Sequence, residues 1–174
     1  ALAQDRVRLV GEGVALVVAE TAQQARDAAE LIVVEYDPLP SVSSIAAAAK
    51  PGAPEIWAQA PGNICFRWED GDRGPVDAAF EGAAHVVGLD AINNRVVLAA
   101  IETRGVVADY NPDGGRFTLH ATTQMPHALK KQLAPILGVA EHRVHVKVGD
   151  VGGGFGGKNG LMPEQILMLW AARR

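Results

Sequence analysis

The stretch 150–159 reads Asp-Val-Gly-Gly-Gly-Phe-Gly-Gly-Lys-Asn, with five glycines in the six positions from Gly152 to Gly157. Successive glycines let consecutive backbone N–H groups face an anion, and they let a flat ligand approach the backbone closely. Phe155 is the single bulky residue and could wall such a ligand, while Lys158 could neutralise negative charge. Glycines lose much conformational freedom on folding, so a run of them is costly unless it has a function. This stretch therefore predicts a ligand-binding loop rather than a loop that only connects two elements.

Two nucleotide-binding motifs fit this loop in part. Gly152, Gly154 and Gly157 match G-x-G-x-x-G, although the acidic residue expected roughly 20 positions later is not in the sequence. Gly152, Gly157 and Lys158 match the beginning of G-x-x-x-x-G-K-[ST], but Asn159 replaces the required hydroxyl residue. A nucleotide-binding protein and a non-enzymatic remnant therefore remain as alternative interpretations.

Apolar spacing predicts the elements that surround the loop. The pattern mixes strands and helices, so the expected fold class is α+β, or mixed α/β. Thr21 and Gln24 have the spacing of a capping box, and Gly138 is expected to close a helix. Strands are expected at 6–10, 14–20, 33–36, 64–69, within 85–100, and at 105–110, 117–122 and 144–148. Helices are expected at 21–32, 43–50, 76–81, 126–137 and from about residue 163.

Composition excludes several classes of protein. The 174 residues are 48% apolar and 21% charged, which argues against intrinsic disorder. Sixteen basic and 20 acidic residues give a net charge of −4. This balance argues against a nucleic-acid-binding protein, because phosphate neutralisation needs a basic face. The longest apolar run, 166–172, is too short for a membrane span of about 20 residues. One cysteine, Cys65, cannot hold an iron–sulfur cluster or form an internal disulfide.

Several charged or ligand-type residues have plainer interpretations. Glu102 and Arg104 alternate on an expected strand and share a face, so each is expected to form a structural ion pair. His142 and His145 are three positions apart, but no third ligand lies nearby in the sequence. We therefore expect no metal site there.

Five stretches of the sequence together carry a resemblance to one protein family. They are the glycine loop at 150–158, Thr-Thr-Gln-Met-Pro-His at 122–127, Ile-Glu-Thr-Arg at 101–104, and the segments 137–144 and 7–42. In this combination the chain resembles the large, molybdopterin-binding subunit of molybdenum hydroxylases, the family of xanthine dehydrogenase, aldehyde oxidase and aerobic carbon monoxide dehydrogenase. The first three stretches are similar to the family's glycine loop, its Thr-Gln-x-Pro-His segment and its Glu-x-Arg segment. The last two resemble its link into the loop strand and the end of its hammerhead domain.

This resemblance implies a domain organisation. Residues 1–45 would be the C-terminal part of a hammerhead domain, 46–62 a linker, and 63–174 the N-terminal part of a molybdopterin-binding domain. The chain has no initiator methionine and ends within an expected helix, so we expect a fragment of a larger subunit. Alone, this fragment is expected to be catalytically inactive.

The resemblance also assigns roles to residues. In the family, the glutamine that matches Gln124 hydrogen-bonds an oxo ligand of molybdenum, and the pterin rather than the protein ligates the metal directly. The general-base glutamate lies downstream, so no catalytic residue is expected here. Asn159 stands where purine-oxidising relatives have a substrate-binding glutamate, and it is expected to lie near the substrate. The cofactor-binding loop residues are Gly153, Gly154, Phe155, Gly156 and Gly157.

The implied reaction is oxidative hydroxylation of an aldehyde, an N-heterocycle or a small substrate such as CO, using a molybdenum-bound oxygen. The cofactor would be molybdopterin, with the cytosine dinucleotide as one form of it. Electrons would pass to iron–sulfur clusters and FAD on partner subunits of a heteromeric complex. The implied location is cytoplasmic, with no membrane span.

Overall fold

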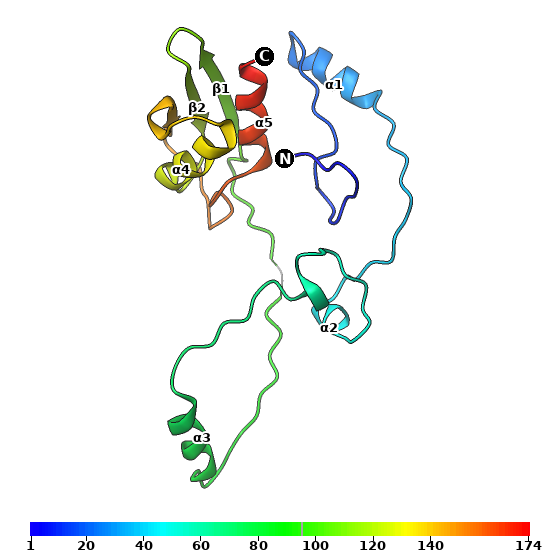
Figure 1. Cartoon of the computed structure of the whole chain (residues 1–174), viewed down its shortest axis with the longest axis vertical. Helices are drawn as coiled ribbons and strands as arrows, with labels where there is room; N and C mark the ends of the chain where they lie inside the picture. Colours follow the sequence, from blue (N-terminus) through cyan, green and yellow to red (C-terminus); the bar gives the residue numbers. More distant parts are fainter. Residues whose placement is uncertain (95) are drawn as a thin grey trace. The chain divides into compact units, whose positions relative to one another are not determined.

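The computed structural model describes residues 1–94 and 96–174. They form two compact units, one made of Ala1–Val33 and Val96–Arg174 and the other of the described residues between these stretches. Figure 1 colours the chain from blue at the N-terminus to red at the C-terminus and labels most of the helices and strands. The α-helices are α1 (Ala22–Glu30), α2 (Ile45–Ala48), α3 (Arg73–Glu81), α4 (Pro126–Leu137) and α5 (Pro163–Ala172); the short 3-10 helices are Pro61–Asn63 and Glu141–Arg143; the strands are β1 (Val106–Asn111), β2 (Arg116–Ala121) and β3 (Val144–Lys147).

A three-stranded mixed sheet, in the order β1-β2-β3, forms the centre of the first unit. β1 and β2 form the expected antiparallel hairpin, with Val106 opposite Ala121. β3 pairs with β2 in parallel, with Phe117 opposite Val144. Gly115 adopts a positive φ of 56° in the hairpin turn, a conformation that glycine tolerates. The mixed α/β class expected from the sequence is therefore confirmed.

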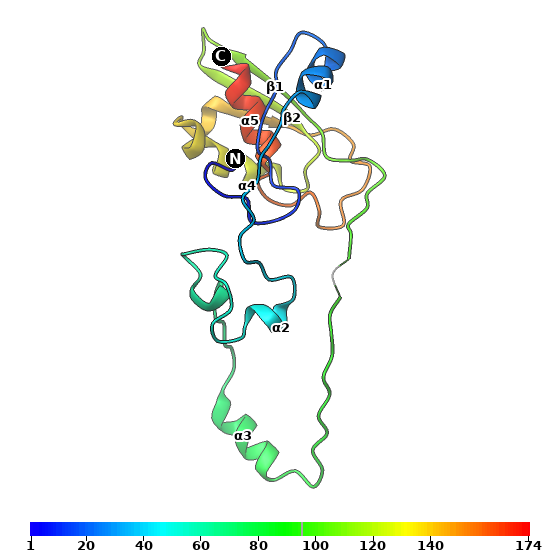
Figure 2. The same cartoon turned by 90° about the vertical axis from the view of Figure 1, so that its right-hand side faces the viewer.

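Two helices bury the apolar side of this sheet. α5 packs against β1 and β2, α4 packs against β3, and the two helices contact each other. Figure 2 shows α5 running beside the hairpin strands. Alternate residues of β2 face this core, as strand geometry requires. The buried apolar side chains of the core are Phe117, Leu119, Ala121, Leu129, Leu133, Ala134, Leu137, Val144 and Leu169.

Helix α4 ends as the sequence predicts. Pro135 lies inside the helix, which continues to Leu137. Gly138 then takes the left-handed conformation, with φ 69° and ψ 34°, and its N–H bonds helical carbonyls. This end places the chain on course for β3, which leads into the glycine loop.

Replacing Gly138 by alanine is expected to lower the free energy of unfolding by roughly 1–2 kcal/mol, the cost of a left-handed L-residue. A Cβ there would meet nothing within 4 Å, so the whole effect is conformational. Chemical denaturation measures it. Gly105→Ala is a matched control, because that glycine also has open space but no positive φ. Equal effects of the two changes would contradict the prediction.

Local side-chain contacts define the ends of the remaining helices. The predicted capping box of α1 is confirmed, with Thr21 and Gln24 each accepting the other's backbone N–H. In the second unit, Asn63 organises its neighbourhood. Its Nδ2 donates to the carbonyls of Ala48 and Pro54 at 3.1 and 3.0 Å. Asn63 itself has a positive φ of 59°, which asparagine tolerates better than most residues.

Several expected strands are wrong for the described residues. The segments 6–10, 14–20, 33–36 and 64–69 form no strand, and the described part of 85–100 forms none either; Arg95 lies outside the described residues. A strand requires hydrogen bonds to a neighbour, and these segments find no partner strand within the described residues. Their apolar side chains are accordingly exposed, as at Val33 with 84% and Val97 with 88%. These segments do alternate apolar and polar residues, but alternation alone does not provide the neighbouring strand that a sheet requires.

Among residues 1–94 and 96–174, no helix has the length and apolar character required to cross a membrane.

Candidate functional site

The glycine loop connects β3 to α5, and its glycines serve two different structural purposes. Gly153 and Gly156 have positive φ values of 99° and 86°, which L-residues rarely adopt. Gly152, Gly154 and Gly157 instead lie against side chains of two other segments. Glycine is therefore required here partly for conformation and partly for close packing.

A Cβ would overlap a neighbouring side chain at two of the packing glycines and would be in tight contact at the third. One built on Gly154 would lie 2.5 Å from Gln124 Cδ and Oε1. One built on Gly152 would lie 2.6 Å from Glu102 Cβ, and one on Gly157 would lie 3.2 Å from Leu98 Cβ. The loop is thus packed on residues 98–102 and on Gln124.

Gln124 precedes α4 and binds the loop through its side-chain oxygen. Oε1 accepts the backbone N–H groups of Gly156 at 3.1 Å and Lys158 at 3.3 Å. This pairing assigns the Nε2 group as the outward donor of the amide. Among the described residues, Nε2 has no hydrogen-bond acceptor. Gln124 therefore presents an unpaired, neutral donor beside the loop.

Lys158 connects the loop to the segment before α4. Its carbonyl oxygen accepts the Gln124 N–H at 3.1 Å and the Thr123 hydroxyl at 3.2 Å. Thr123 is buried, and its hydroxyl oxygen also accepts the N–H of Met125. Thr123 and Gln124 thus hold the end of the loop in place, and Met125 in turn orients the Thr123 hydroxyl.

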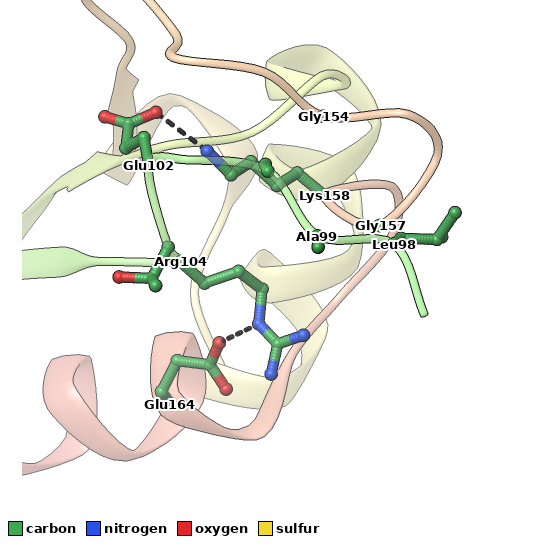
Figure 3. A pocket seen from close by; sticks show the side chains of 10 residues that line it. Leu98, Ala99, Glu102, Arg104, Gly154, Gly157, Lys158 and Glu164 are labelled. Atoms are coloured by element: carbon green, nitrogen blue, oxygen red, sulfur yellow. Dashed lines mark hydrogen bonds and ion pairs between the residues drawn. The ribbon is translucent and has the colours of Figure 1, made fainter. Parts of the chain in front are cut away.

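The side chain of Lys158 forms an ion pair within the protein. Its Nζ lies 2.7 Å from Glu102 Oε2, and only 3% of the side chain is exposed. Figure 3 shows the two side chains pointing toward each other. The hydrogen bond from Lys158, together with that from the Gly152 N–H, lowers the pKa of the Glu102 carboxyl below its ordinary value of 4.5. The charge of Lys158 is therefore matched by Glu102, which differs from the expectation that it neutralises a ligand.

This lowered pKa predicts a pH dependence. The contribution of Glu102 to stability is complete above pH 4.5, its ordinary value, and is lost as the pH falls through the lower pKa of the folded state. The difference in unfolding free energy between wild type and Glu102→Gln is expected to shrink over that acidic window. Denaturation curves recorded across the acidic range measure it. A difference that stays constant as the pH falls would contradict the prediction.

A second ion pair lies two residues further along. Arg104 Nε is 2.7 Å from Glu164 Oε1 in the first turn of α5, and both side chains are partly exposed. The prediction that Glu102 and Arg104 form ion pairs is confirmed. Their placement on a strand is wrong, since 101–102 form a bend and no strand begins before Val106. The two residues therefore do not share a strand face. Glu102 pairs with Lys158 and Arg104 with Glu164, both of which are distant in the sequence.

These contacts border an open cleft of about 650 Å³. Segment 98–104 forms one wall, the loop another, and α5 contributes Glu164 (Figure 3). The lining residues are Leu98, Ala99, Ala100, Glu102, Thr103, Arg104, Gly154, Gly157, Lys158 and Glu164.

The crest of the loop, residues 153–155, offers hydrogen-bond donors. Within the described part of the chain, the N–H groups of Gly153, Gly154 and Phe155 donate to no acceptor. Phe155 is 72% exposed and has a positive φ of 49°, a conformation unusual for a bulky residue. Backbone strain of this kind often marks a binding site. The crest can therefore accept an electronegative group beside an aromatic ring.

The structure brings most of the sequence-predicted site residues together. Gln124 contacts the loop directly, and Asn159 follows Lys158 as an exposed residue whose N–H bonds the Gly156 carbonyl at 3.3 Å. Sequence reasoning missed two contributors, the carboxylate of Glu102 and the hydroxyl of Thr123. The Glu-x-Arg and Thr-Thr-Gln segments contained both, but nothing in their spacing indicated contact with a loop over 30 residues away.

The geometry disfavours a phosphate-binding P-loop. In that motif the lysine faces the phosphates from the start of a helix. Here α5 begins only at Pro163, and the Lys158 ammonium is buried against Glu102. In the described residues, no group of three or more histidine, cysteine, aspartate or glutamate side chains could hold a metal ion. Any metal at this loop would have to arrive with a ligand of its own.

A glycine loop with free N–H donors, an exposed aromatic ring and a neutral glutamine amide is suited to binding a large organic ligand. Comparison with known families identifies the class of protein. Residues 56–174 match the molybdopterin cofactor-binding domain, and residues 1–40 match the aldehyde oxidase and xanthine dehydrogenase a/b hammerhead domain. The chain belongs to this family of molybdenum hydroxylase large subunits.

Curated relatives support the same assignment. The nicotine 6-hydroxylase large subunit of Paenarthrobacter nicotinovorans is 41% identical over 172 residues, covering 99% of this chain and 21% of that protein. The carbon monoxide dehydrogenase large chain of Hydrogenophaga pseudoflava is 33% identical, covering 98% and 23%. This chain therefore spans about a fifth of the length of the relatives it matches.

Solved structures are also similar. Quinoline 2-oxidoreductase from Pseudomonas putida 86 matches with a TM-score of 0.86 and 38% identity, over 99% of this chain and 22% of that one. A Cu,Mo-CO dehydrogenase matches with a TM-score of 0.87 and 34% identity, over 99% and 23%.

Proposed function

We propose that this chain is part of the catalytic subunit of a molybdenum hydroxylase and that the loop 152–157 binds its molybdenum–pterin cofactor. The observation that carries the proposal is the contact between Gln124 and the loop. Gln124 Oε1 accepts from Gly156 and Lys158, which leaves Nε2 as an unpaired donor beside the exposed crest.

The residues present fit such a cofactor. The positive φ values at Gly153 and Gly156 shape a turn whose N–H groups at 153–155 have no acceptor in the described chain. A Cβ at Gly154 would overlap Gln124, so the close approach of loop and glutamine depends on glycine. With no cluster of metal-ligating side chains among the described residues, the metal would be ligated through the pterin.

Each of these residues has a distinct task in the proposal. When bound, the cofactor supplies the redox centre that removes two electrons from the substrate. Gln124 donates from Nε2 to an electronegative group of the cofactor without adding charge. The backbone of Phe155 and Gly156 would hold the cofactor, and the Phe155 ring would keep water from one side. The general base would come from sequence outside this chain.

The proposed substrate class is based on the relatives and on Asn159. We propose an N-heterocycle, an aldehyde or a small CO-like molecule. Relatives are described as acting on nicotine, quinoline and carbon monoxide, and two of these three are N-heterocycles. Asn159 would lie near the substrate and supplies an amide in place of a carboxylate, which disfavours purine binding through a glutamate.

Partners and domain divisions complete the proposal. In this proposal, electrons leave through iron–sulfur clusters and FAD on partner subunits of a heteromeric complex in the cytoplasm, and the one cysteine of these residues, Cys65, cannot itself hold a cluster. The cytosine dinucleotide is the proposed extension of the pterin. We place the hammerhead part at 1–45, a linker at 46–62, and the cofactor-binding part at 63–174.

Molybdenum and pterin analysis of the intact subunit that carries this chain tests the proposal. We expect close to one molybdenum and one pterin for each chain, measured by elemental mass spectrometry and by fluorescence of the oxidised pterin. Binding of ATP or NAD with neither molybdenum nor pterin would instead support the nucleotide-binding alternative and overturn the assignment.

A further inference from the structure

We infer that Glu102 is a positioning residue for the cofactor loop, because its carboxylate closes the loop at both ends and thereby fixes the amide of Gln124. The inference rests on the proposed function for its consequence, but the contacts that support it lie within the chain. They involve one oxygen atom of Glu102, the two ends of the loop, and the backbone of Lys158.

A single carboxylate oxygen binds the entrance and the exit of the loop. Glu102 Oε2 accepts the backbone N–H of Gly152 at 2.7 Å and the Nζ of Lys158 at 2.7 Å. The Glu102 N–H also donates to the Gly152 carbonyl at 3.2 Å. The six residues from Gly152 to Gly157 are therefore enclosed between two contacts to the same side chain.

The contact at Lys158 continues to Gln124, the residue proposed to bind the cofactor. The Lys158 N–H donates to Gln124 Oε1, and its carbonyl accepts from the Gln124 N–H. A shift of the Lys158 backbone would remove an acceptor or a donor from Gln124 and would leave the Gly156 N–H as the one hydrogen bond that orients its side-chain amide among the described residues. Glu102 therefore acts on the cofactor through Lys158 and Gln124 rather than by contact.

Charge makes this arrangement sensitive to substitution. The Lys158 side chain is 3% exposed, so its ammonium depends on Glu102 for its one ion pair in the described residues. A buried ammonium without a partner is strongly unfavourable. Glu102→Gln keeps an acceptor for Gly152 but removes the charge facing Lys158, and the backbone of Lys158 should then move outward with its side chain.

Hydrogen–deuterium exchange of the intact subunit, prepared without its cofactor, tests this directly. In Glu102→Gln we expect the hydrogen-bonded amides at the exit of the loop, 156–158, to exchange about tenfold faster, the effect of losing one charge-assisted hydrogen bond. The amides of β2 and α4 should keep their wild-type rates. In the cofactor-loaded preparation, molybdenum per chain should fall by a similar factor.

Glu164→Gln is the matched comparison. It breaks the Arg104–Glu164 ion pair, whose N–O distance is also 2.7 Å, and leaves the hydrogen bonds of the loop in place. Loop exchange in Glu164→Gln should equal that of wild type. Equal acceleration in both variants would overturn the inference, because it would reflect general loosening.

Glu102→Asp supplies a second test if Glu102→Gln does not fold. It keeps the charge but withdraws the carboxylate by one methylene, so acceleration confined to 156–158 is expected, smaller than for glutamine. Unchanged loop exchange, or acceleration spread over β2 and α4, would contradict the inference. If the wild-type subunit contained no molybdenum, the proposed function would be wrong but the positioning role of Glu102 would still be tested, because the exchange comparison uses cofactor-free protein.

Discussion

Gly154→Ala is expected to reduce the molybdenum content of the intact subunit about tenfold or more. The new Cβ would lie 2.5 Å from Gln124 Cδ and Oε1, well inside van der Waals contact. Gly154 also accepts the Gly157 N–H at 2.7 Å, so the loop backbone cannot move away freely. Overpacking of this kind costs roughly 1–3 kcal/mol, and 1.4 kcal/mol corresponds to a tenfold change in affinity.

Gly149→Ala provides the control for this prediction. Gly149 lies just before the loop, has no positive φ, and would place its Cβ in open space. The molybdenum content of Gly149→Ala should therefore match that of wild type. If Gly154→Ala also retained full molybdenum and pterin, the packing of Gln124 against the loop would have no part in cofactor binding.

Gln124→Glu is expected to lower turnover by about 10²-fold, the usual effect of removing one donor at a developing charge, while most of the molybdenum remains bound. The substituted carboxylate can still accept the N–H groups of Gly156 and Lys158, so the loop keeps its contacts. It cannot donate, however, because an ionised carboxylate has no N–H. The substitution thus separates the two functions of the amide.

Gln132→Glu makes the same chemical change at an exposed position of α4 and controls for added charge. Its turnover and molybdenum content should remain at wild-type values. Normal turnover in Gln124→Glu would show that the Nε2 donor has no role in the reaction. Loss of molybdenum in Gln124→Glu would show instead that the amide is needed for retention.

Local signals predicted a large part of this fold. The turn residues at 111–115 and the alternation around them predicted the hairpin, and Gly138 predicted the end of α4 within one residue. The Thr21 capping box was also readable, because its partners are three positions apart. These features depend on contacts between near neighbours in sequence, which composition and spacing encode.

Features that depend on distant partners were harder to predict. The segments around Val33 and Val97 have strand-like sequences, but no partner strand lies among the described residues. The contact between Glu102 and Lys158 joins residues 56 positions apart, and no local pattern indicates it. Glu102 and Arg104 were correctly expected to form ion pairs, although their partners and their backbone conformation were not.

The side chain at position 159 stands apart from this network of contacts. Asn159 is exposed, and among the described residues its side-chain amide makes no hydrogen bond, whereas its neighbour Lys158 is held by its N–H, its carbonyl and its ammonium. A codon change at 159 would therefore leave the geometry of the preceding residues intact. A substitution at position 159 is therefore expected to change the chemistry of the surface next to the loop at little cost in folding free energy.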